Sequence, residues 1–469
     1  MGRRRKKKIV SDVTLTGIAD KGQAVGRDEG GMVYFVAGAV PGDVVDVWVK
    51  KKKNSYRVGV VEQFKHKSEE RVTPFCQHFG DCGGCKWQYL DYEAQLKYKE
   101  ESIVDAFTRI GQLEIKEQRP ILGCDKTKQY RNKMEYSFSS RRWVPQEELD
   151  SEEEVNFGPA TGFHKAGAFN MVVQIEHCHL QENLSNEIRN FVHKLALEQE
   201  WTFYNPREHH GLLRNLMIRN TTLGDWMLVM IFGEDDKEAI DYFLEKVEKE
   251  FPQLSSIYYV INKKLNDSTV DQEFLHYAKE KTITEALGHI KYKIGPKSFF
   301  QTNTYQAKRL YDKVVELAEL KGDELVYDLY TGLGSIALYV ADKCRKVVGV
   351  EEIAPAIEDA NFNKELNGVS NAEFVVGDCK EVFTEAFVAQ HGSPDLIIVD
   401  PPRAGLHKDV VAVLEKTGVA KIVYVSCNPS TQARDLALLH DAYSVELIQP
   451  VDMFPHTHHI ENIALLKKR

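Results

Sequence analysis

The strongest candidate for a reactive residue in this sequence is a cysteine that directly follows an apolar run. The run Lys421-Ile-Val-Tyr-Val425 is typical of a buried strand, and Ser426-Cys427-Asn428-Pro429 follows it directly, so that the proline ends the strand. Ligands of open α/β sheets bind at the carboxyl ends of the strands. A lone cysteine at such a place can be plain core packing, because free cysteine is among the most buried residue types. The motifs around it favour a reactive thiol.

Acidic residues and a glycine-rich turn follow the other apolar runs of the same region. Gly332-Leu-Gly-Ser-Ile-Ala337 fits the G-x-G-x-x-A fingerprint of adenosine-containing cofactors, and Glu351 lies about 20 residues further on, where an acid binds ribose hydroxyls. Asp378 and Asp400 each follow a further run. The spacing fits both NAD and S-adenosylmethionine (SAM). Hydride transfer needs neither a cysteine nor Asp400-Pro-Pro, whereas methyl transfer to a poor carbon nucleophile needs a thiolate, so SAM is the predicted cofactor.

A second group of thiols lies nearer the N-terminus. The pattern Cys76-x5-Cys82-x2-Cys85 contains intervening glycines and predicts a loop that wraps a metal group. Such a group needs a fourth soft ligand, and Cys178 is the best candidate. Four thiolates bind both structural zinc and Fe–S clusters. Zinc has further candidate ligands in His78, His177 and His179. The spacing alone therefore leaves zinc and iron open.

Three sequence patterns predict the elements that position these residues. Residues 9–66 contain short apolar runs separated by Gly26, Gly30-Gly31 and Pro41-Gly42, which is typical of a small OB-type barrel. A helix is expected from Leu90 to Leu113, and an α+β region over 119–296, in which the acidic segment 146–154 is a solvated loop. From residue 297 strands and helices alternate, which predicts a doubly wound parallel sheet. Its strands are expected at 325–329, 346–350, 373–376, 396–399 and 421–425, with 444–450 and 461–466 pairing antiparallel at the edge.

The charge distribution bears on the partner. The net charge of −9 argues against nucleic acid when taken alone, but residues 1–70 carry 15 Lys and Arg against nine Asp and Glu. Ten of these positive charges lie in Arg3–Lys8 and Lys50–Lys53, and two such runs in one small module favour phosphate contacts. No apolar run approaches the roughly 20 residues that span a bilayer, and no apolar segment follows the basic start as in a secretory signal. Eight cysteines in 469 residues are too sparse for a disulfide scaffold, so a cytoplasmic protein is expected.

Taken together, these motifs resemble the RNA uracil-C5 methyltransferases, specifically the Fe–S-containing branch that acts on 23S ribosomal RNA. The resemblance covers nearly the whole chain and includes a basic N-terminus similar to a TRAM domain. Its remaining motifs are Tyr130-Arg-Asn-Lys133, Ser298-Phe-Phe-Gln-Thr-Asn303, Asp400-Pro-Pro-Arg-Ala-Gly405, Ser426-Cys-Asn-Pro429 and His458-His-Ile-Glu461. It implies a TRAM-like RNA-binding domain over 1–66, a central α+β domain with an Fe–S loop over 67–296, and a Rossmann-like SAM-dependent catalytic domain over 297–469. Residues 93–118 are expected to pack with the catalytic domain, and a monomer is expected.

The same resemblance implies roles for individual residues. It makes Cys427 the nucleophile and Glu461 the base, and it makes the metal group a 4Fe–4S cluster on Cys76, Cys82, Cys85 and Cys178. The implied SAM contacts are Gln301, Tyr330, Ser335, Glu351, Asp378 and Asp400. Some members carry Phe and Asn in place of Tyr330 and Ser335. A free thiol is only a few per cent ionised at neutral pH, so the site is expected to lower the pKa of Cys427.

Three other functions fit parts of the pattern. The first is a uridine-C5 methyltransferase that acts on tRNA. The second is a methyltransferase of another target: amino-methylating enzymes place an aromatic residue after Asp-Pro-Pro, where this chain has Arg403, and cytosine-C5 enzymes place their cysteine after a proline, an order absent here. The third is a non-catalytic Fe–S protein that binds RNA. Titration with SAM and uracil-containing RNA separates the second and the third from the predicted function.

Overall fold

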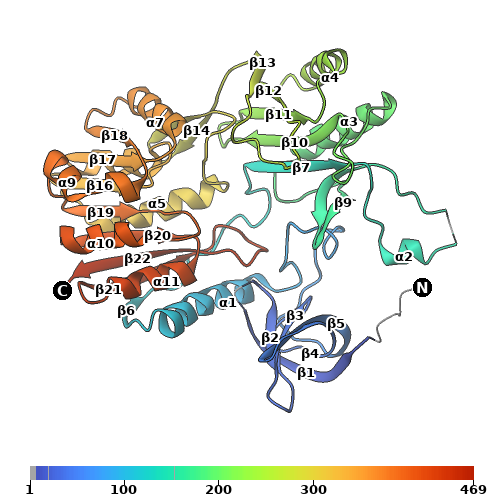
Figure 1. Ribbon diagram of the computed structural model, residues 1–469, viewed down its shortest axis with the longest axis horizontal. Coiled ribbons are helices and arrows are strands. Elements are labelled where there is room, and N and C mark those ends of the chain that lie inside the picture. The colour runs from blue at the N-terminus through green and yellow to red at the C-terminus, as the bar shows by residue number, and fades with distance from the viewer. Residues whose placement is uncertain (1–6, 20, 153) are drawn as a thin grey trace.

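The structure is a computed structural model that describes residues 7–19, 21–152 and 154–469. Arg3 to Lys6 of the first basic run lie outside the described residues. Three units are visible in Figure 1: a small barrel in blue, a central unit in green, and a C-terminal unit in yellow to red that lies beside the other two.

The N-terminal unit is a closed five-stranded barrel. Its strands are β1 (Ile9–Ile18), β2 (Ala24–Arg27), β3 (Val33–Ala37), β4 (Val44–Lys52) and β5 (Tyr56–His66). They follow the order β1-β2-β3-β5-β4, and β1 closes the barrel on β4. Alternate residues point inward, so that Val13, Val36 and Val47 form a small apolar core. The placement of Gly26 between strands is wrong: it lies in β2, where a Cβ would come within 2.0 Å of the Thr14 carbonyl oxygen.

A linker segment, residues 67–118, connects the barrel to the C-terminal unit. After a loop that carries three of the cysteines, α1 (Tyr92–Asp105) begins at Asp91, whose side chain accepts from the Glu93 N–H at 3.0 Å. The helix continues as the π-helical turn η1 (Ala106–Ile110), and β6 (Ile115–Gln118) follows. β6 pairs in parallel with β21 (Tyr443–Val451), so this linker packs on the C-terminal sheet.

The central unit is a seven-stranded sheet with two helices on one face. Its elements are β7 (Lys133–Ser139), α2 (Gln146–Leu149), β8 (Ala160–Lys165), β9 (Ala168–Gln174), α3 (Leu184–Glu198), β10 (Leu213–Asn220), β11 (Trp226–Phe232), α4 (Lys237–Glu250), β12 (Ser256–Ile261) and β13 (Leu275–Lys279). The strand order is β13-β12-β11-β10-β7-β8-β9, and α3 and α4 bury their apolar faces against it. The acidic segment was expected to be a loop, but its start forms the short helix α2, which projects from the unit in Figure 1.

A small hairpin and an eight-stranded sheet form the C-terminal unit. Its strands are β14 (Ile283–Leu287), β15 (Ile290–Ile294), β16 (Leu325–Leu329), β17 (Lys346–Glu351), β18 (Ala372–Val376), β19 (Leu396–Val399), β20 (Lys421–Ser426), β21 and β22 (Glu461–Lys468). Its helices are α5 (Thr304–Ala318), α6 (Ser335–Val340), η2 (Ala341–Lys343), α7 (Ala354–Leu366), α8 (Cys379–Val382), α9 (Glu385–His391), α10 (Lys408–Thr417) and α11 (Pro429–Leu438).

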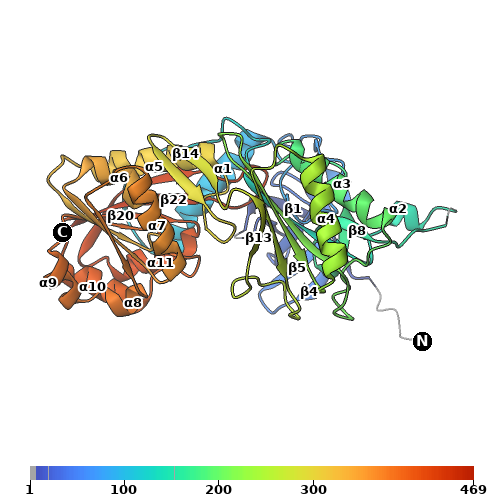
Figure 2. The same cartoon turned by 90° about the horizontal axis from the view of Figure 1, so that it is seen from above.

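The order of this sheet determines where a ligand can bind. The order is β18-β17-β16-β19-β20-β22-β21-β6, with β16 to β20 parallel and β22 antiparallel to both of its neighbours. α5 and α6 contribute to the core on one face, and α10, α11 and α1 to the core on the other. Figure 2 shows α5 and α6 on the opposite side of the sheet from α10. The chain reverses its direction of travel across the sheet between β16 and β19, and ligands of such sheets bind at the carboxyl ends of the strands beside that switch point.

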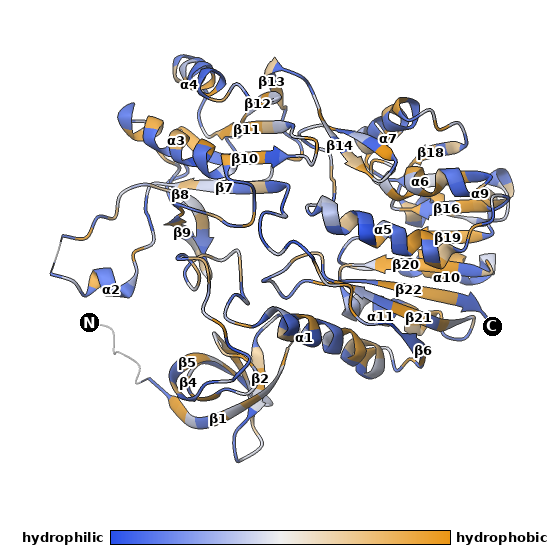
Figure 3. Cartoon of the chain, turned by 180° about the vertical axis from the view of Figure 1, so that it is seen from behind, coloured by the Kyte–Doolittle hydropathy of each residue, from blue (hydrophilic) through white to orange (hydrophobic). Residues whose placement is uncertain are grey.

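The hydropathy of the surface agrees with these layers. Figure 3 shows hydrophobic residues concentrated on the strands of the C-terminal sheet and on the buried sides of its helices, whereas α2 is hydrophilic. In the part of the chain that the structure describes, no helix is both long and apolar enough to cross a membrane.

Candidate active site and cysteine-lined cavity

Cys427 lies between the end of β20 and the first turn of α11. Asn428 caps that helix: its side-chain oxygen accepts from the Ser430 N–H at 3.1 Å. The side-chain amide of Asn428 also donates to the Arg403 carbonyl at 3.0 Å. This bond ties the Ser-Cys-Asn-Pro turn to the Asp-Pro-Pro-Arg loop that follows β19. Cys427 is therefore held beside Asp400 and Arg403 at the carboxyl edge of the sheet.

The electrostatic environment of Cys427 differs from the expected one. Burial, together with the charges of Glu461 and Asp400, raises the pKa of the Cys427 thiol to about 11, while Arg403 opposes the shift. The expectation that the site lowers this pKa is therefore wrong for the protein alone. The physical reason is that two carboxyl groups and partial burial outweigh one guanidinium. Glu461, the first residue of β22, lies near Cys427 because β22 pairs with β20, with Ser426 opposite Asn462.

Three carboxyl groups crowd the same edge. Burial raises the pKa of Asp328 and of Asp400 to about 7, and the charge of Asp328 adds to the shift of Asp400. Burial and Asp400 hold the pKa of Glu461 well above its usual range. Asp328 accepts from the Thr331 hydroxyl at 2.6 Å and the Ala337 N–H at 3.0 Å, but its other carboxyl oxygen is buried without a partner among the described residues. This arrangement is electrostatically suited to a cationic ligand.

The glycine-rich turn joins β16 to α6 through left-handed backbone. Tyr330, Gly332 and Gly334 have φ values of 67°, 58° and 80°. A Cβ at Gly334 would lie 2.8 Å from the Phe374 ring, so only glycine fits that position. The turn also orients an acid: the N–H groups of Gly332 and Ile353 each donate to the Glu351 carboxylate at 3.0 Å.

The structure brings the expected SAM residues to this one edge. Tyr330 and Ser335 follow β16, Glu351 ends β17, and Asp378 and Asp400 follow β18 and β19; all five are half-buried. The hydroxyl groups of Ser335 and Tyr311 lie 2.9 Å apart.

Asp378 and Gln301 also have partners within the protein itself. The Asp378 carboxylate caps α8 by accepting from the Lys380 N–H at 3.0 Å, and it also pairs with the Lys380 ammonium at 2.7 Å. The carbonyl of Gln301, just before α5, accepts from the side-chain amide of Asn132 at 2.9 Å, which leaves the Gln301 side chain available to a ligand.

A separate cavity of about 360 Å³ brings the four expected metal-binding cysteines together. Cys76, Cys82, Cys85 and Cys178 line it. Burial and the neighbouring thiols raise the pKa of Cys82 and Cys85 to about 12. Among the described residues no group of three or more His, Cys, Asp or Glu side chains is placed to hold a single metal ion. As a donor set, the four thiols fit an Fe–S cluster, which is held by cysteine thiolates.

Several residues of interest had no role in the sequence-based analysis. Asp328 lies near the end of β16, just before the glycine-rich turn, so an acid at the end of the strand was the available signal. Phe299, two residues before the expected SAM contact Gln301, is an aromatic side chain that is 72% exposed. Lys99 and Asp452 form an ion pair in which neither side chain is exposed. Nothing in the sequence links two residues so far apart in the chain.

Comparisons with known proteins identify the family. Residues 221–469 match the family model described as tRNA (Uracil-5-)-methyltransferase, and residues 5–61 match the TRAM domain. The chain is 47% identical to an uncharacterized RNA methyltransferase of Bacteroides thetaiotaomicron, over 96% of this chain and 100% of that protein. It is also 47% identical to one of Porphyromonas gingivalis, over 96% of this chain and 98% of that protein.

A solved structure agrees with these matches. The tRNA (uracil-54, C5)-methyltransferase of Pyrococcus abyssi, in complex with S-adenosyl-L-homocysteine, superposes with a TM-score of 0.73 and 30% identity, over 97% of this chain and 99% of that one. The expected fold class, with a Rossmann-like SAM-dependent methyltransferase domain and a TRAM barrel, is confirmed. The chain belongs to the tRNA (uracil-5-)-methyltransferase family of RNA methyltransferases.

Proposed function

We propose that this protein methylates C5 of a uridine in RNA, with Cys427 as the nucleophile and Glu461 as the base. The observation that carries the proposal is the convergence of a thiol and a buried carboxyl group on two paired strands, close enough that the charge of Glu461 raises the pKa of Cys427. C5 of uracil is a poor nucleophile until a group adds to C6. The Cys427 thiolate forms a bond to C6, and the electrons of the C5–C6 double bond move into the uracil ring as an enolate.

SAM supplies the methyl group that C5 acquires when the cofactor is bound. The residues proposed to hold it are Gln301, Tyr330, Ser335, Glu351, Asp378 and Asp400. The raised pKa values of Asp328, Asp400 and Glu461 support a positively charged cofactor, because a sulfonium ion offsets charges that otherwise repel one another. The same positive charge favours the Cys427 thiolate, which the protein alone disfavours.

Glu461 completes the proposed reaction. Its carboxylate accepts the C5 proton, the electrons of that C–H bond restore the C5–C6 double bond, and the C6–sulfur bond breaks to release the Cys427 thiolate. Burial disfavours the ionised carboxylate, which makes Glu461 a stronger base than an exposed glutamate.

Positive charge at the mouth of the site supports an RNA substrate. Burial and the charges of Arg403, Lys86, Lys99 and Arg131 lower the pKa of His459 to about 4. These cations lie near His459 on a chain whose net charge is −9, so they are suited to phosphate contacts. The exposed ring of Phe299 offers a surface on which a base can stack. A target uridine must leave its stack to reach Cys427.

The proposed substrate is a uridine of 23S ribosomal RNA, which rests on the resemblance to the Fe–S-containing branch. A tRNA uridine is the second candidate, and the likeness to the Pyrococcus abyssi tRNA enzyme favours it. Mapping of 5-methyluridine in ribosomal and transfer RNA from a strain that lacks the gene tests both. Loss of one 23S position, restored by the wild-type gene but not by a Cys427→Ala gene, is the expected result. Loss from tRNA alone would select the second candidate, and unchanged RNA in both pools would contradict the proposal.

We also propose that the cysteine-lined cavity holds a 4Fe–4S cluster. Anaerobically purified protein is expected to be brown and to contain about four irons per chain, because a cubane cluster is held by four thiolates. Iron analysis and the visible spectrum measure this. Cys82→Ser should lose most of the iron, whereas Cys344→Ser, at a buried cysteine outside the cavity, should keep it. Colourless wild-type protein with one tightly bound zinc would contradict the assignment.

A further inference from the structure

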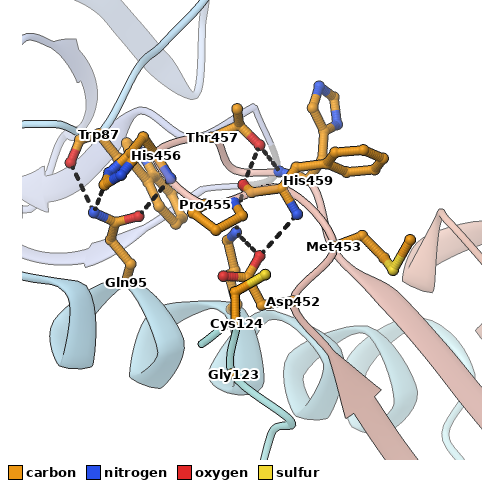
Figure 4. Close-up of polar contacts among 12 residues, drawn as sticks. Trp87, Gln95, Gly123, Cys124, Asp452, Met453, Pro455, His456, Thr457 and His459 are labelled. Carbon is orange, nitrogen blue, oxygen red and sulfur yellow. Dashed lines mark hydrogen bonds and ion pairs between the residues drawn. The ribbon is translucent and has the colours of Figure 1, made fainter. Parts of the chain in front are cut away.

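The connection between β21 and β22, residues 452–460, ends at Glu461 and is fixed to distant parts of the chain (Figure 4). We propose that Gln95, Lys99 and Asp452 are positioning residues: they lock this connection to the cysteine-bearing loop and so place the Glu461 carboxylate for proton removal. The inference rests on the proposed role of Glu461. It explains why polar groups are buried where no ligand is expected.

A buried ion pair fixes the start of the connection. The Lys99 ammonium donates to Asp452 at 2.6 Å and to the Phe454 carbonyl at 3.1 Å. The Tyr92 hydroxyl donates to the other Asp452 oxygen at 2.8 Å, and the Phe454 N–H donates to the first at 3.1 Å. Burying two charges is costly, and apolar residues of similar size often stabilise a protein as well. The pair therefore makes better sense as a device that specifies one backbone conformation than as a source of stability.

Gln95 fixes the middle of the connection at a strained residue. His456 has a φ of 66°, in the left-handed region that side chains other than glycine rarely adopt. Its N–H donates to the side-chain oxygen Oε1 of Gln95 at 2.8 Å, and its ring nitrogen Nε2 donates to the Thr127 carbonyl at 3.1 Å. The Gln95 amide donates in turn to the carbonyls of Trp87 at 3.1 Å and Leu90 at 2.8 Å. Strained backbone of this kind persists only where the surroundings enforce it, and it clusters at functional sites.

The same residue joins the connection to the cysteine-bearing loop. The N–H groups of Lys86 and Trp87, which follow Cys85 directly, both donate to the His456 carbonyl, at 2.9 and 3.0 Å. Figure 4 shows Trp87, Gln95 and His456 meeting above α1, with Asp452 below them. A group bound by the cysteines would thus be coupled to residues 452–460 through these two main-chain hydrogen bonds.

The other end of the connection leads to the base. Val451, the residue before Asp452, lies opposite Glu461 in the β21–β22 pair. Three residues separate Thr457 from Glu461. One of them, His459, donates its N–H to the Thr457 hydroxyl at 3.2 Å. Cys427 and the residues proposed to bind SAM lie on other strand ends. Loosening the connection should therefore misplace Glu461 and leave the thiol and the cofactor residues in position.

The predicted defect is specific to one step. Lys99→Met and Gln95→Met should lower kcat about tenfold to a hundredfold, since small misplacements of a catalytic group cost that much. The dissociation constant of SAM and the KM for RNA should stay within about twofold of wild type, because uniform binding is untouched. Both variants should accumulate a covalent protein–RNA adduct that carries labelled methyl, which is also the expected result for Glu461→Gln. Hydrogen exchange of the 452–460 peptide, followed by mass spectrometry, should speed up in both.

Two further variants separate positioning from folding. Arg214→Met removes an equally buried cation that holds the Asn262 and Lys264 carbonyls at 2.7 Å in the central unit, and it should give no adduct even if it lowers stability. Lys99→Met/Asp452→Leu removes both buried charges, so it should fold even if Lys99→Met does not, yet Phe454 still loses its partners and the adduct should still appear.

The outcomes are distinct. An adduct in the Gln95 and Lys99 variants, with faster exchange of the 452–460 peptide, supports the inference. Normal turnover, an adduct in Arg214→Met to the same extent, or unchanged exchange in folded Lys99 variants would overturn it. If Glu461→Gln itself forms no adduct, the role of Glu461 fails, and the inference fails with it. If Glu461→Gln stalls while the Lys99 and Gln95 variants turn over normally, the inference is overturned and the proposed role of Glu461 is not.

Discussion

Cys427→Ala should lower methylation of RNA by about a thousandfold or more, the scale of loss seen when a catalytic nucleophile is removed. The thiol acts on C6 of the base, so without it C5 never becomes nucleophilic enough to accept a methyl group. SAM binding should stay within about twofold of wild type, because the residues proposed to hold the cofactor lie on other strand ends. Incorporation of labelled methyl into RNA measures the first quantity, and calorimetric titration with SAM measures the second.

Two matched variants sharpen this result. Cys344→Ala truncates a buried cysteine in the apolar core of the same unit and should keep normal activity once folded. Cys427→Ser keeps the size of the side chain but replaces the thiol by a hydroxyl group, which is far harder to ionise, so it should be almost as inactive as the alanine variant. Turnover of Cys427→Ala within about tenfold of wild type would exclude Cys427 as the nucleophile.

The C-terminal sheet was the most predictable part of the fold. Its parallel strands are buried on both faces, so each reads as a short continuous apolar run, and all five expected strands exist as β16 to β20. The antiparallel pair at 444–450 and 461–466 exists as well, but β6 rather than β21 forms the edge of the sheet. β6 has one half-buried and three exposed residues, so its sequence carries no strand signal. Its place in the sheet comes from pairing with β21, a contact between segments far apart in the chain.

The candidate site was also predictable only in part. Motif residues that follow strands were found because the carboxyl ends of parallel strands meet at one edge. The pKa of Cys427 was expected in the wrong direction, because that value depends on how closely Glu461 and Asp400 approach the thiol and how deeply it is buried. The contacts of Gln95 and Lys99 with residues 452–456 were missed for a related reason. A buried polar side chain on a helix has no sequence signature until its distant partner is known.

The charges at the site link binding of the cofactor to ionisation of Cys427 in the proposed mechanism. Burial and the charges of Glu461 and Asp400 raise the pKa of Cys427, which favours the protonated thiol in the protein without cofactor. In the proposed mechanism a cationic cofactor opposes the two negative charges, and it therefore favours the thiolate when a methyl group is at hand. Such coupling would protect Cys427 from unproductive addition to uridines. It also means that loss of the Glu461 charge should ease, rather than hinder, formation of the thiolate.

Glu461→Gln is accordingly expected to block the reaction after methyl transfer and not before it. Glutamine keeps the size of the side chain, but it cannot accept a proton as a carboxylate does. The variant should flip the uridine, add Cys427 to C6 and acquire the methyl group on C5. With no base to remove the C5 proton, the C6–sulfur bond cannot break. Steady-state turnover should fall by about a hundredfold to ten-thousandfold, the usual contribution of a positioned general base.

The stalled species provides the measurement. On a denaturing gel with methyl-labelled SAM, the label should migrate with a protein–RNA band that is heavier than the protein. Cys427→Ala/Glu461→Gln should show no such band, since the covalent bond never forms. Water or His458 could remove the proton slowly, so the band should decay over time rather than persist. The decay rate would then report how much of the proton transfer depends on Glu461. A Glu461→Gln enzyme that turns over normally and traps no RNA would exclude Glu461 as the base, and the buried carboxyl group would then act only on the pKa of the neighbouring thiol.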